Sequence, residues 1–191
     1  SELNPVSLYA RCKIESEKVV LSYDYDYFCP TVLRLATVHG LSYRPRFDLV
    51  VNLLTIKALV DKKIDIFGGN QWRPFLSISD VCEGILSVLR SPCEKIKNQI
   101  FNLGDSLENY KLLDIGMIIQ NLLPEVDVKI IEDQADKRNY HVNFDKIVQT
   151  LEFKAKKKVI DSMKDIICAY RKDRSFFNYN DSRFHNHSAL K

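Results

Sequence analysis

The sequence predicts an α/β protein with a mostly parallel sheet, on two observations. Short runs of β-branched and aliphatic residues, bounded by glycine or proline, alternate along the chain with longer stretches whose apolar residues recur at helical spacing. Strands that alternate with helices in this way are typical of parallel pairing. An apolar share of 46% and a charged share of 28% are those of a globular protein that can bury a core.

The first half of the chain contains two helix–strand pairs. A helix is predicted over residues 7–22, because Ser7 can cap it and apolar residues recur among charged ones. The β-branched run at 31–38 lies between a proline and a glycine and predicts one buried parallel strand. A helix with one apolar face follows over 48–61, and a short strand over 63–67 ends at a pair of glycines.

The second half continues the alternation. Asp80 is expected to cap a helix that runs to residue 89. The other predicted elements are strands at 75–78, 99–103 and 126–131, and helices at 112–123, 145–151 and 159–171. Residues 172–191 are polar and aperiodic and predict a flexible tail, with a partner-docking arm as the alternative.

Composition argues against several function classes. The net charge of +3 is too small for a nucleic-acid-binding face, and the lysine run at 154–158 is interpreted as a solvated segment before a helix. No apolar run approaches the roughly 20 residues that span a bilayer, and the first residues are not patterned like a signal peptide. We therefore expect neither a nucleic-acid partner nor a membrane.

The five cysteines are scattered, without the short spacings of zinc sites or redox motifs. Such a set is typical of reduced thiols, which predicts a cytoplasmic protein. His185 and His187 lie close together in the tail, but no third ligand is in reach, so no metal site is expected.

The strongest local signal for chemistry is the pair Tyr9 and Lys13. Four residues apart on a helix, the two side chains lie on one face, a turn apart. A nearby ammonium stabilises a phenolate, so the pair could accept and return a proton at a sugar hydroxyl or carbonyl. Taken alone, the spacing is also common on surface helices, and an inert surface pair is the alternative.

The segment around this pair, Asn4-Pro5-Val6-Ser7-Leu8-Tyr9-Ala10-Arg11-Cys12-Lys13, resembles the active-site segment of extended short-chain dehydrogenases/reductases of the NAD-dependent epimerase/dehydratase type. Further stretches are similar to that family and follow in the family's order. They are residues 33–40, residues 67–81 around Trp72-Arg73-Pro74, residues 101–104 and residues 136–147.

The resemblance implies the C-terminal part of a Rossmann-like doubly wound parallel sheet, plus a small mixed α/β substrate-binding subdomain. Residues 1–47 would end the Rossmann-like domain, residues 48–171 would bind substrate, with 75–104 returning to the sheet, and residues 172–191 would form the tail. No Gly-rich dinucleotide loop is present in the sequence. We therefore expect the cofactor-binding half to be missing and the chain to be inactive alone.

For the cofactor, NAD or NADP, the resemblance implies two groups of contacts. Tyr9 would be the catalytic acid/base, and Lys13 would hold the nicotinamide ribose and favour the phenolate. Leu35, Ala36 and Thr37 would line the nicotinamide, largely through their backbone.

For a nucleotide diphosphate sugar as substrate, the resemblance implies a different set. Arg73 would clamp the diphosphate, Arg138 would add a second contact, and Asn52 would border the nucleotide. The sequence departs from the family at two places. Thr37 stands where many relatives have a phosphate-binding asparagine, and it would still contact the substrate through one hydrogen bond, with a shorter reach. Pro74 replaces a frequent acidic residue. Arg73 in a surface ion pair and Arg138 in a solvated loop are the alternatives.

The function implied is that of an NAD(P)-dependent nucleotide-sugar epimerase or dehydratase, working as a homodimer. An NADPH-dependent keto-sugar reductase and a non-catalytic nucleotide-binding or scaffolding protein remain open. His39 is interpreted as a packing residue rather than a base. Because the run at 31–38 is apolar on both faces, we expect it to pair with another chain or with sequence beyond these residues.

Overall fold

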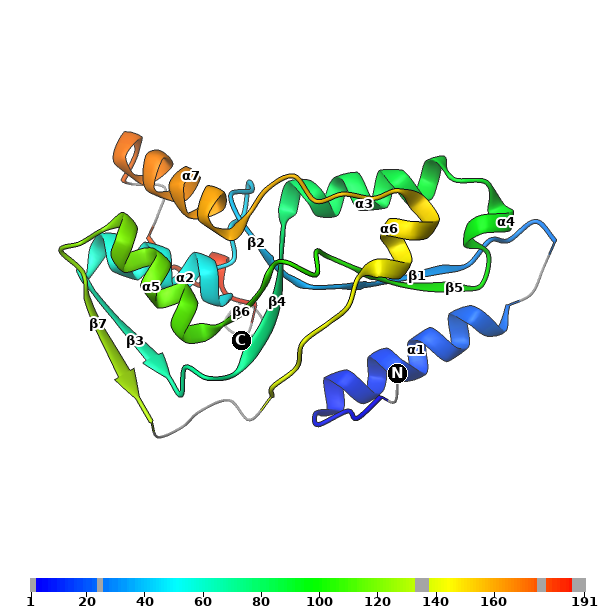
Figure 1. Ribbon diagram of the computed structural model, residues 1–191, viewed down its shortest axis with the longest axis horizontal. Helices are drawn as coiled ribbons and strands as arrows, with labels where there is room; N and C mark the ends of the chain where they lie inside the picture. The colour runs from blue at the N-terminus through cyan, green and yellow to red at the C-terminus, as the bar shows by residue number, and fades with distance from the viewer. Residues whose placement is uncertain (1–2, 24–25, 133–137, 175–177, 187–191) are drawn as a thin grey trace.

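The strands of this chain divide among small sheets along one long axis (Figure 1). The structure is a computed structural model that describes residues 3–23, 26–132, 138–174 and 178–186. Within these residues the sheets are β1–β5, β2–β4–β6 and β3–β7. The α/β class and the predominance of parallel pairing are therefore confirmed.

At one end of the molecule, β1 (Thr31–Leu35) pairs in parallel with β5 (Gln99–Leu103). The helices α1 (Leu8–Ser22) and α3 (Ile78–Arg90) lie on opposite sides of this pair (Figure 1). Two short helices complete this end, α4 (Cys93–Ile96) and α6 (Asp145–Leu151).

In the middle, β4 (Trp72–Ser77) pairs in parallel with β2 (Thr37–His39) and antiparallel with β6 (Asn109–Lys111). The prediction of one strand over 31–38 is wrong, because the run changes partner at Ala36. The Ala36 N–H still donates to the Leu103 carbonyl at 3.0 Å, whereas the next residue pairs with Phe75 of β4.

At the other end, β3 (Lys63–Phe67) pairs in parallel with β7 (Asp127–Ile131). Two helices pack on this pair, α2 (Val50–Val60) and α5 (Leu112–Leu122), and a third, α7 (Val159–Lys172), packs on α2 and α5 (Figure 1). Their apolar faces meet in one core, which also takes in Phe75 from β4 and Phe47 from the loop before α2.

A second core lies where α3 and α6 cover β5. It includes Val81 and Val88 from α3, Phe101 and Leu103 from β5, and Ile147 from α6. The approach is closest at Gly84 of α3, where a Cβ would lie 2.4 Å from a methyl carbon of Leu103. A glycine is therefore needed there for the helix to reach the strand.

The start of α3 corrects the predicted cap. Ser77, not Asp80, is the N-cap, since its Oγ accepts the Asp80 N–H at 3.1 Å. The buried Asp80 carboxylate accepts the Ser77 hydroxyl at 2.7 Å and the backbone N–H groups of Lys156 and Lys157 at 3.0 Å each. It thereby fastens the segment before α7 to the start of α3.

The described part of the tail, residues 178–186, packs against the body of the protein, which differs from the predicted flexible tail. A turn of 3-10 helix (Ser182–Phe184) places Phe184 in the first core, 5% exposed. Its ring lies 5.3 Å from that of Phe47, and its carbonyl accepts the Phe47 N–H at 3.0 Å. One buried aromatic residue thus anchors a polar segment.

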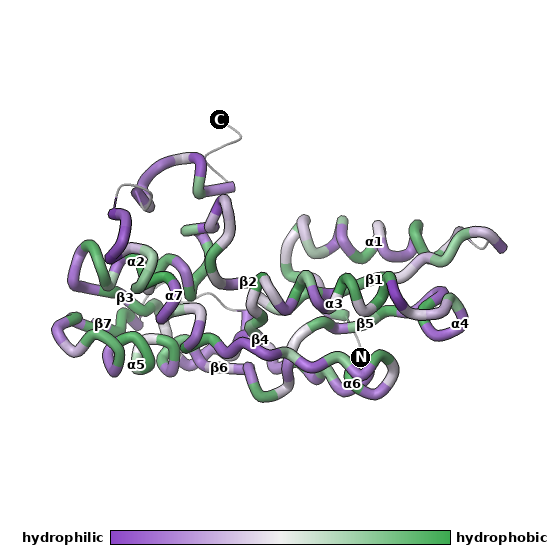
Figure 2. Tube along the Cα trace, turned by 90° about the horizontal axis from the view of Figure 1, so that it is seen from above, coloured by the Kyte–Doolittle hydropathy of each residue, from purple (hydrophilic) through white to green (hydrophobic). Residues whose placement is uncertain are grey.

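By contrast, α1, which the structure describes in full, buries none of its residues. Seen from above, it lies beside β1 and apart from the rest of the molecule (Figure 2). An ion pair connects the two, in which Arg34 of β1 donates to both carboxylate oxygens of Glu17, with its Nη2 2.5 Å from Oε2. Within the described residues, no helix is both long and apolar enough to cross a membrane.

Candidate functional site

The pair Tyr9 and Lys13 lies in the first turns of α1. Ser7 caps the helix by accepting the Ala10 N–H at 3.2 Å, which fixes the turn that carries Tyr9. The Lys13 ammonium lies 5.6 Å from the centre of the Tyr9 ring, so the two side chains face each other. Tyr9 is 72% exposed. The juxtaposition expected from the spacing is therefore present, on an open surface.

The start of α1 lies toward the middle of the long axis, as does the carboxyl end of β1 (Figures 1 and 2). At that end the chain passes from β1 to β2, so Leu35, Ala36 and Thr37 span the point where the partner strand changes from β5 to β4. Leu35 is 48% exposed and Ala36 is buried. Carboxyl ends of parallel strands, where strand order switches, are the usual ligand-binding edge of open α/β sheets.

Asn52 lies on α2 and is buried, with its amide turned to the backbone of Gly40. Its Oδ1 accepts the Gly40 N–H at 2.9 Å, and its Nδ2 donates to the Gly40 carbonyl at 3.4 Å. Gly40 has φ +105°, which favours glycine. In this structure Asn52 therefore holds the turn after β2, and that contact occupies the amide predicted to border a nucleotide.

Arg73 is 7% exposed, and its guanidinium is held by the chain itself. Its Nη1 donates to the Trp72 carbonyl at 2.8 Å and also to the Arg138 carbonyl. The guanidinium carbon lies 5.2 Å from the centre of the Tyr140 ring. The structure thus brings Arg73 and Arg138 together, through a backbone contact.

The segment that carries Arg138 runs alongside β4 and β6 and is hydrogen-bonded to both. Asn139 Oδ1 accepts the Trp72 N–H at 2.9 Å. The Asn109 amide exchanges two hydrogen bonds of 3.0 Å with the backbone of Val142. No role was predicted from the sequence for Asn139, Tyr140 or Asn109, although the first two lie in the stretch 136–147 that is similar to the family.

His39, at the end of β2, is 1% exposed and packs against Phe75, with ring centroids 6.3 Å apart. Within the described residues, neither ring nitrogen has a hydrogen-bond partner. Burial lowers the pKa of His39 to about 4; the charge of Asp80 opposes this shift to a smaller extent, and the charge of Lys157 adds to it. A neutral, enclosed imidazole of this kind fits the interpretation of His39 as a packing residue.

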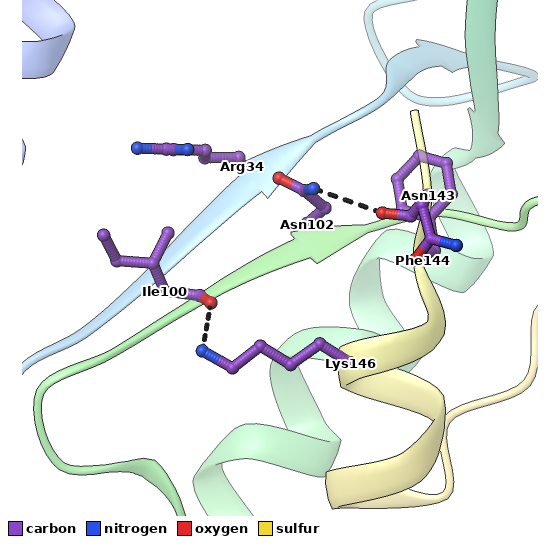
Figure 3. A pocket seen from close by; sticks show the side chains of 6 residues that line it. All are labelled: Arg34, Ile100, Asn102, Asn143, Phe144 and Lys146. Atoms are coloured by element: carbon purple, nitrogen blue, oxygen red, sulfur yellow. Dashed lines mark hydrogen bonds between the residues drawn. The ribbon is translucent and has the colours of Figure 1, made fainter. Parts of the chain in front are cut away.

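A hollow of about 320 Å³ lies beside β5, lined by Arg34, Ile100, Asn102, Asn143, Phe144 and Lys146 (Figure 3). Its polar groups are engaged: Lys146 donates to the Ile100 carbonyl at 2.9 Å, Asn102 to the Asn143 carbonyl at 3.2 Å, and Arg34 to Glu17. None of the predicted site residues, all of which the structure describes, lines it. We interpret this hollow as an edge of the fold and place the candidate site at Tyr9 and Lys13.

The described residues hold no group of three or more His, Cys, Asp or Glu side chains placed to bind a metal ion. The candidate groups are a phenol and an ammonium on α1, the strand edge between β1 and β2, and two arginine-bearing segments that meet near the start of β4.

Known proteins share this arrangement of elements. A dTDP-glucose 4,6-dehydratase from Bacillus anthracis, solved in complex with NAD, superposes with a TM-score of 0.76 at 22% identity, over 91% of this chain and 55% of that one. A UDP-glucuronic acid 4-epimerase from Bacillus cereus, solved with UDP-glucuronic acid and NAD, gives 0.75 at 23%, over 88% and 55%. At such identities the likeness shows the Rossmann-like fold.

Sequence comparison leads to the same group. Protein CapI of Staphylococcus aureus is 28% identical over 186 residues, which make up 87% of this chain and 55% of that protein. The chain thus spans about half the length of the relatives it matches. The family described as the NAD dependent epimerase/dehydratase family matches residues 1–104. Since that match takes in more than half of the sequence, the chain belongs to the NAD-dependent epimerase/dehydratase family.

Proposed function

We propose that this chain is the substrate-side part of an NAD(P)-dependent epimerase or dehydratase of nucleotide sugars, with Tyr9 as its acid/base. The observation that carries the proposal is the Lys13 ammonium, 5.6 Å from the ring centre of an exposed tyrosine in a chain of this family. The dehydratase and epimerase described above act on dTDP-glucose and UDP-glucuronic acid, which suggests the class of substrate.

The residues present fit the nicotinamide end of a dinucleotide. A hydroxyl and an ammonium on α1 suit the ribose, and the half-exposed apolar side chain of Leu35 suits the flat ring. The sequence holds no Gly-rich loop for the pyrophosphate, so in this proposal that contact comes from outside these residues. Bound NAD or NADP would act as hydride acceptor and donor.

In the proposed reaction, the Tyr9 oxygen takes a proton from a sugar hydroxyl and later returns it. The ammonium of Lys13 stabilises the negative charge on that oxygen while the proton is away. Whether the oxidised sugar is reduced on its other face or first loses water distinguishes epimerase from dehydratase, and both begin with the same proton transfer.

The diphosphate of the substrate would meet the arginine-bearing segments. Arg73 and Arg138 bring two positive charges to adjoining parts of the chain, and guanidinium groups pair well with phosphate oxygens. In this structure Arg73 donates to backbone carbonyls, so we expect substrate binding to rearrange residues 138–142 around it.

Two other functions remain candidates. A keto-sugar reductase would use the same tyrosine and lysine with NADPH. A non-catalytic nucleotide-binding protein would keep the arginines and make no use of the tyrosine hydroxyl.

The test uses a polypeptide that joins this chain to a dinucleotide-binding half from a relative, assayed against UDP- and dTDP-sugars. Tyr9→Phe is expected to lower turnover about 10²–10⁴-fold, the usual range for loss of an acid/base group, while the sugar nucleotide still binds. The matched control is Tyr43→Phe, since Tyr43 is fully exposed in the loop before α2. Undiminished turnover in Tyr9→Phe would refute the assignment, and binding without turnover in both forms would favour the non-catalytic alternative.

A further inference from the structure

Two of the five cysteines lie together, although they are far apart in the sequence. Cys29 precedes Pro30 and β1, and Cys93 is the first residue of α4. The Cys29 Sγ lies 3.8 Å from the Cys93 carbonyl oxygen, a weak sulfur hydrogen bond. The neighbouring Cys93 thiol, followed by partial burial, raises the pKa of Cys29.

The backbone around the thiols keeps them in place. The Asn98 N–H donates to the Pro30 carbonyl at 2.8 Å, and the Thr31 hydroxyl donates to the Ile96 carbonyl at 2.9 Å. From Thr31 and Gln99 onward, β1 and β5 pair in parallel register. The segment before β1 and the α4 segment are therefore fixed to each other by contacts that do not depend on the sulfur atoms.

We propose that Cys29 and Cys93 form a redox-sensitive thiol pair, which a peroxide converts to a disulfide between the start of β1 and α4. The pair has no place in the sugar chemistry proposed above, and it stands independently of that chemistry.

The chemistry takes place in two steps. The Cys93 thiolate attacks one peroxide oxygen, the O–O bond breaks, and Cys93 becomes a sulfenic acid while hydroxide leaves and is protonated to water. The Cys29 sulfur then attacks the sulfenic sulfur, the S–S bond forms, the S–O bond breaks and a second water leaves. Both sulfurs are oxidised by one electron each, and the peroxide is reduced by two.

The exposures of the two thiols set this order. Cys93 is exposed, whereas Cys29 is half-buried and its pKa is raised. The thiolate is the nucleophile, so the accessible Cys93 meets the peroxide first and Cys29 resolves it. The other cysteines, Cys12, Cys82 and Cys168, are exposed on α1, α3 and α7 and provide internal controls.

The experiment treats the fully reduced 191-residue chain with hydrogen peroxide, alkylates the remaining thiols and maps the peptides by mass spectrometry. The Cys29–Cys93 link is expected to form at least about tenfold faster than any other cysteine pair, since thiols on two segments fixed to each other act at millimolar or higher effective concentration. Dithiothreitol should restore both thiols. In Cys29→Ser, the Cys93 sulfenic acid should accumulate and react with dimedone, and in Cys12→Ser the link should form as in the unmodified chain.

Two results would overturn the proposal. One is that Cys29 and Cys93 are still recovered as separate alkylated thiols after the peroxide treatment, while Cys12, Cys82 and Cys168 have been oxidised. The other is that disulfides form between all cysteines without preference. Because the unmodified chain gives the decisive measurement, a variant that fails to fold does not affect the conclusion.

Discussion

Buried polar side chains in this chain differ in how well they are paired. Asp80 accepts a hydroxyl and two backbone N–H groups, whereas His39, equally enclosed, has no hydrogen-bond partner within the described residues. An imidazole in that position is tolerated only while neutral, because charging it would leave a cation buried away from water. At the scale of single residues, His39 is therefore where pH should act on stability.

The pH prediction follows from the direction of that shift. The folded-state pKa of about 4 lies below the ordinary 6.5, so between these values the unfolded chain binds a proton that the folded chain does not. The free energy of unfolding should therefore fall as pH is lowered from 6.5 to 4, by roughly 3 kcal/mol from His39 alone. His39→Leu should remove most of this acid-side loss, measured by urea unfolding across that range.

The matched control is His141→Leu, because His141 is exposed and rests against Trp72. It should leave the slope of stability against pH unchanged. A slope that persists in His39→Leu and disappears in His141→Leu would contradict the assignment.

At the scale of elements, the turn between β2 and α2 depends on one side chain. Asn52 forms hydrogen bonds with both the N–H and the carbonyl of Gly40. Gly40 has a φ of +105°, a backbone conformation in which a residue with a Cβ would be strained. Asn52→Ala should leave the buried Gly40 N–H without its acceptor and cost about 1–3 kcal/mol of unfolding free energy. Asn121→Ala, at an exposed position of α5, should change it little. Equal effects in thermal unfolding of the two variants would contradict this account.

The docked tail makes a second prediction at this scale. Phe184 is the buried contact of a segment otherwise rich in polar residues, and its ring packs on Phe47. Phe184→Ala should destabilise the fold by about 3 kcal/mol and increase hydrogen exchange in residues 44–48 as well as in the tail. Arg183→Ala, next to it and exposed, is the control. Faster exchange in the tail alone would mean that the tail does not support the loop.

Comparison of prediction with structure shows which elements local sequence determines. The helices at 112–123 and 159–171 and the strands at 63–67 and 99–103 were predicted within a residue or so, because each has its own apolar pattern and a clear end. The division of 31–38 was missed, since it depends on partner strands far along the chain. β6 was also missed: Asn109–Lys111 has no strand pattern and is a strand only because β4 lies beside it.

The candidate site divides in the same way. The facing of Tyr9 and Lys13 could be predicted, because helix geometry alone determines it. The engagement of Asn52 with Gly40 and of Arg73 with Tyr140 could not, because each contact joins segments that only the tertiary fold brings together.

At the scale of the whole molecule, the end that contains β1 and α1 buries less of its surface than the rest. Within the described residues β1 has a single strand neighbour, β5, and the helix beside it buries none of its residues. A parallel sheet of two strands is rarely stable with an open face and edge, and open strand edges recruit other strands. The apolar side chains of Leu8 and Val19 lie on one face of α1, both exposed. This end is where we expect further protein to pack, either sequence beyond these residues or a second copy.

The chain in isolation should therefore self-associate at micromolar concentrations, as exposed edges and apolar faces promote. Sedimentation velocity tests this directly. The double variant Leu8→Lys, Val19→Lys should reduce association if the chains meet through the face of α1. It should leave association unchanged if they meet through the open edge of β1. Ile85→Lys with Leu89→Lys, on the exposed side of α3, is the matched control for added charge. A folded monomer at all concentrations, with native circular dichroism, would show that β1 and α1 are stable as they stand and that neither surface has a partner.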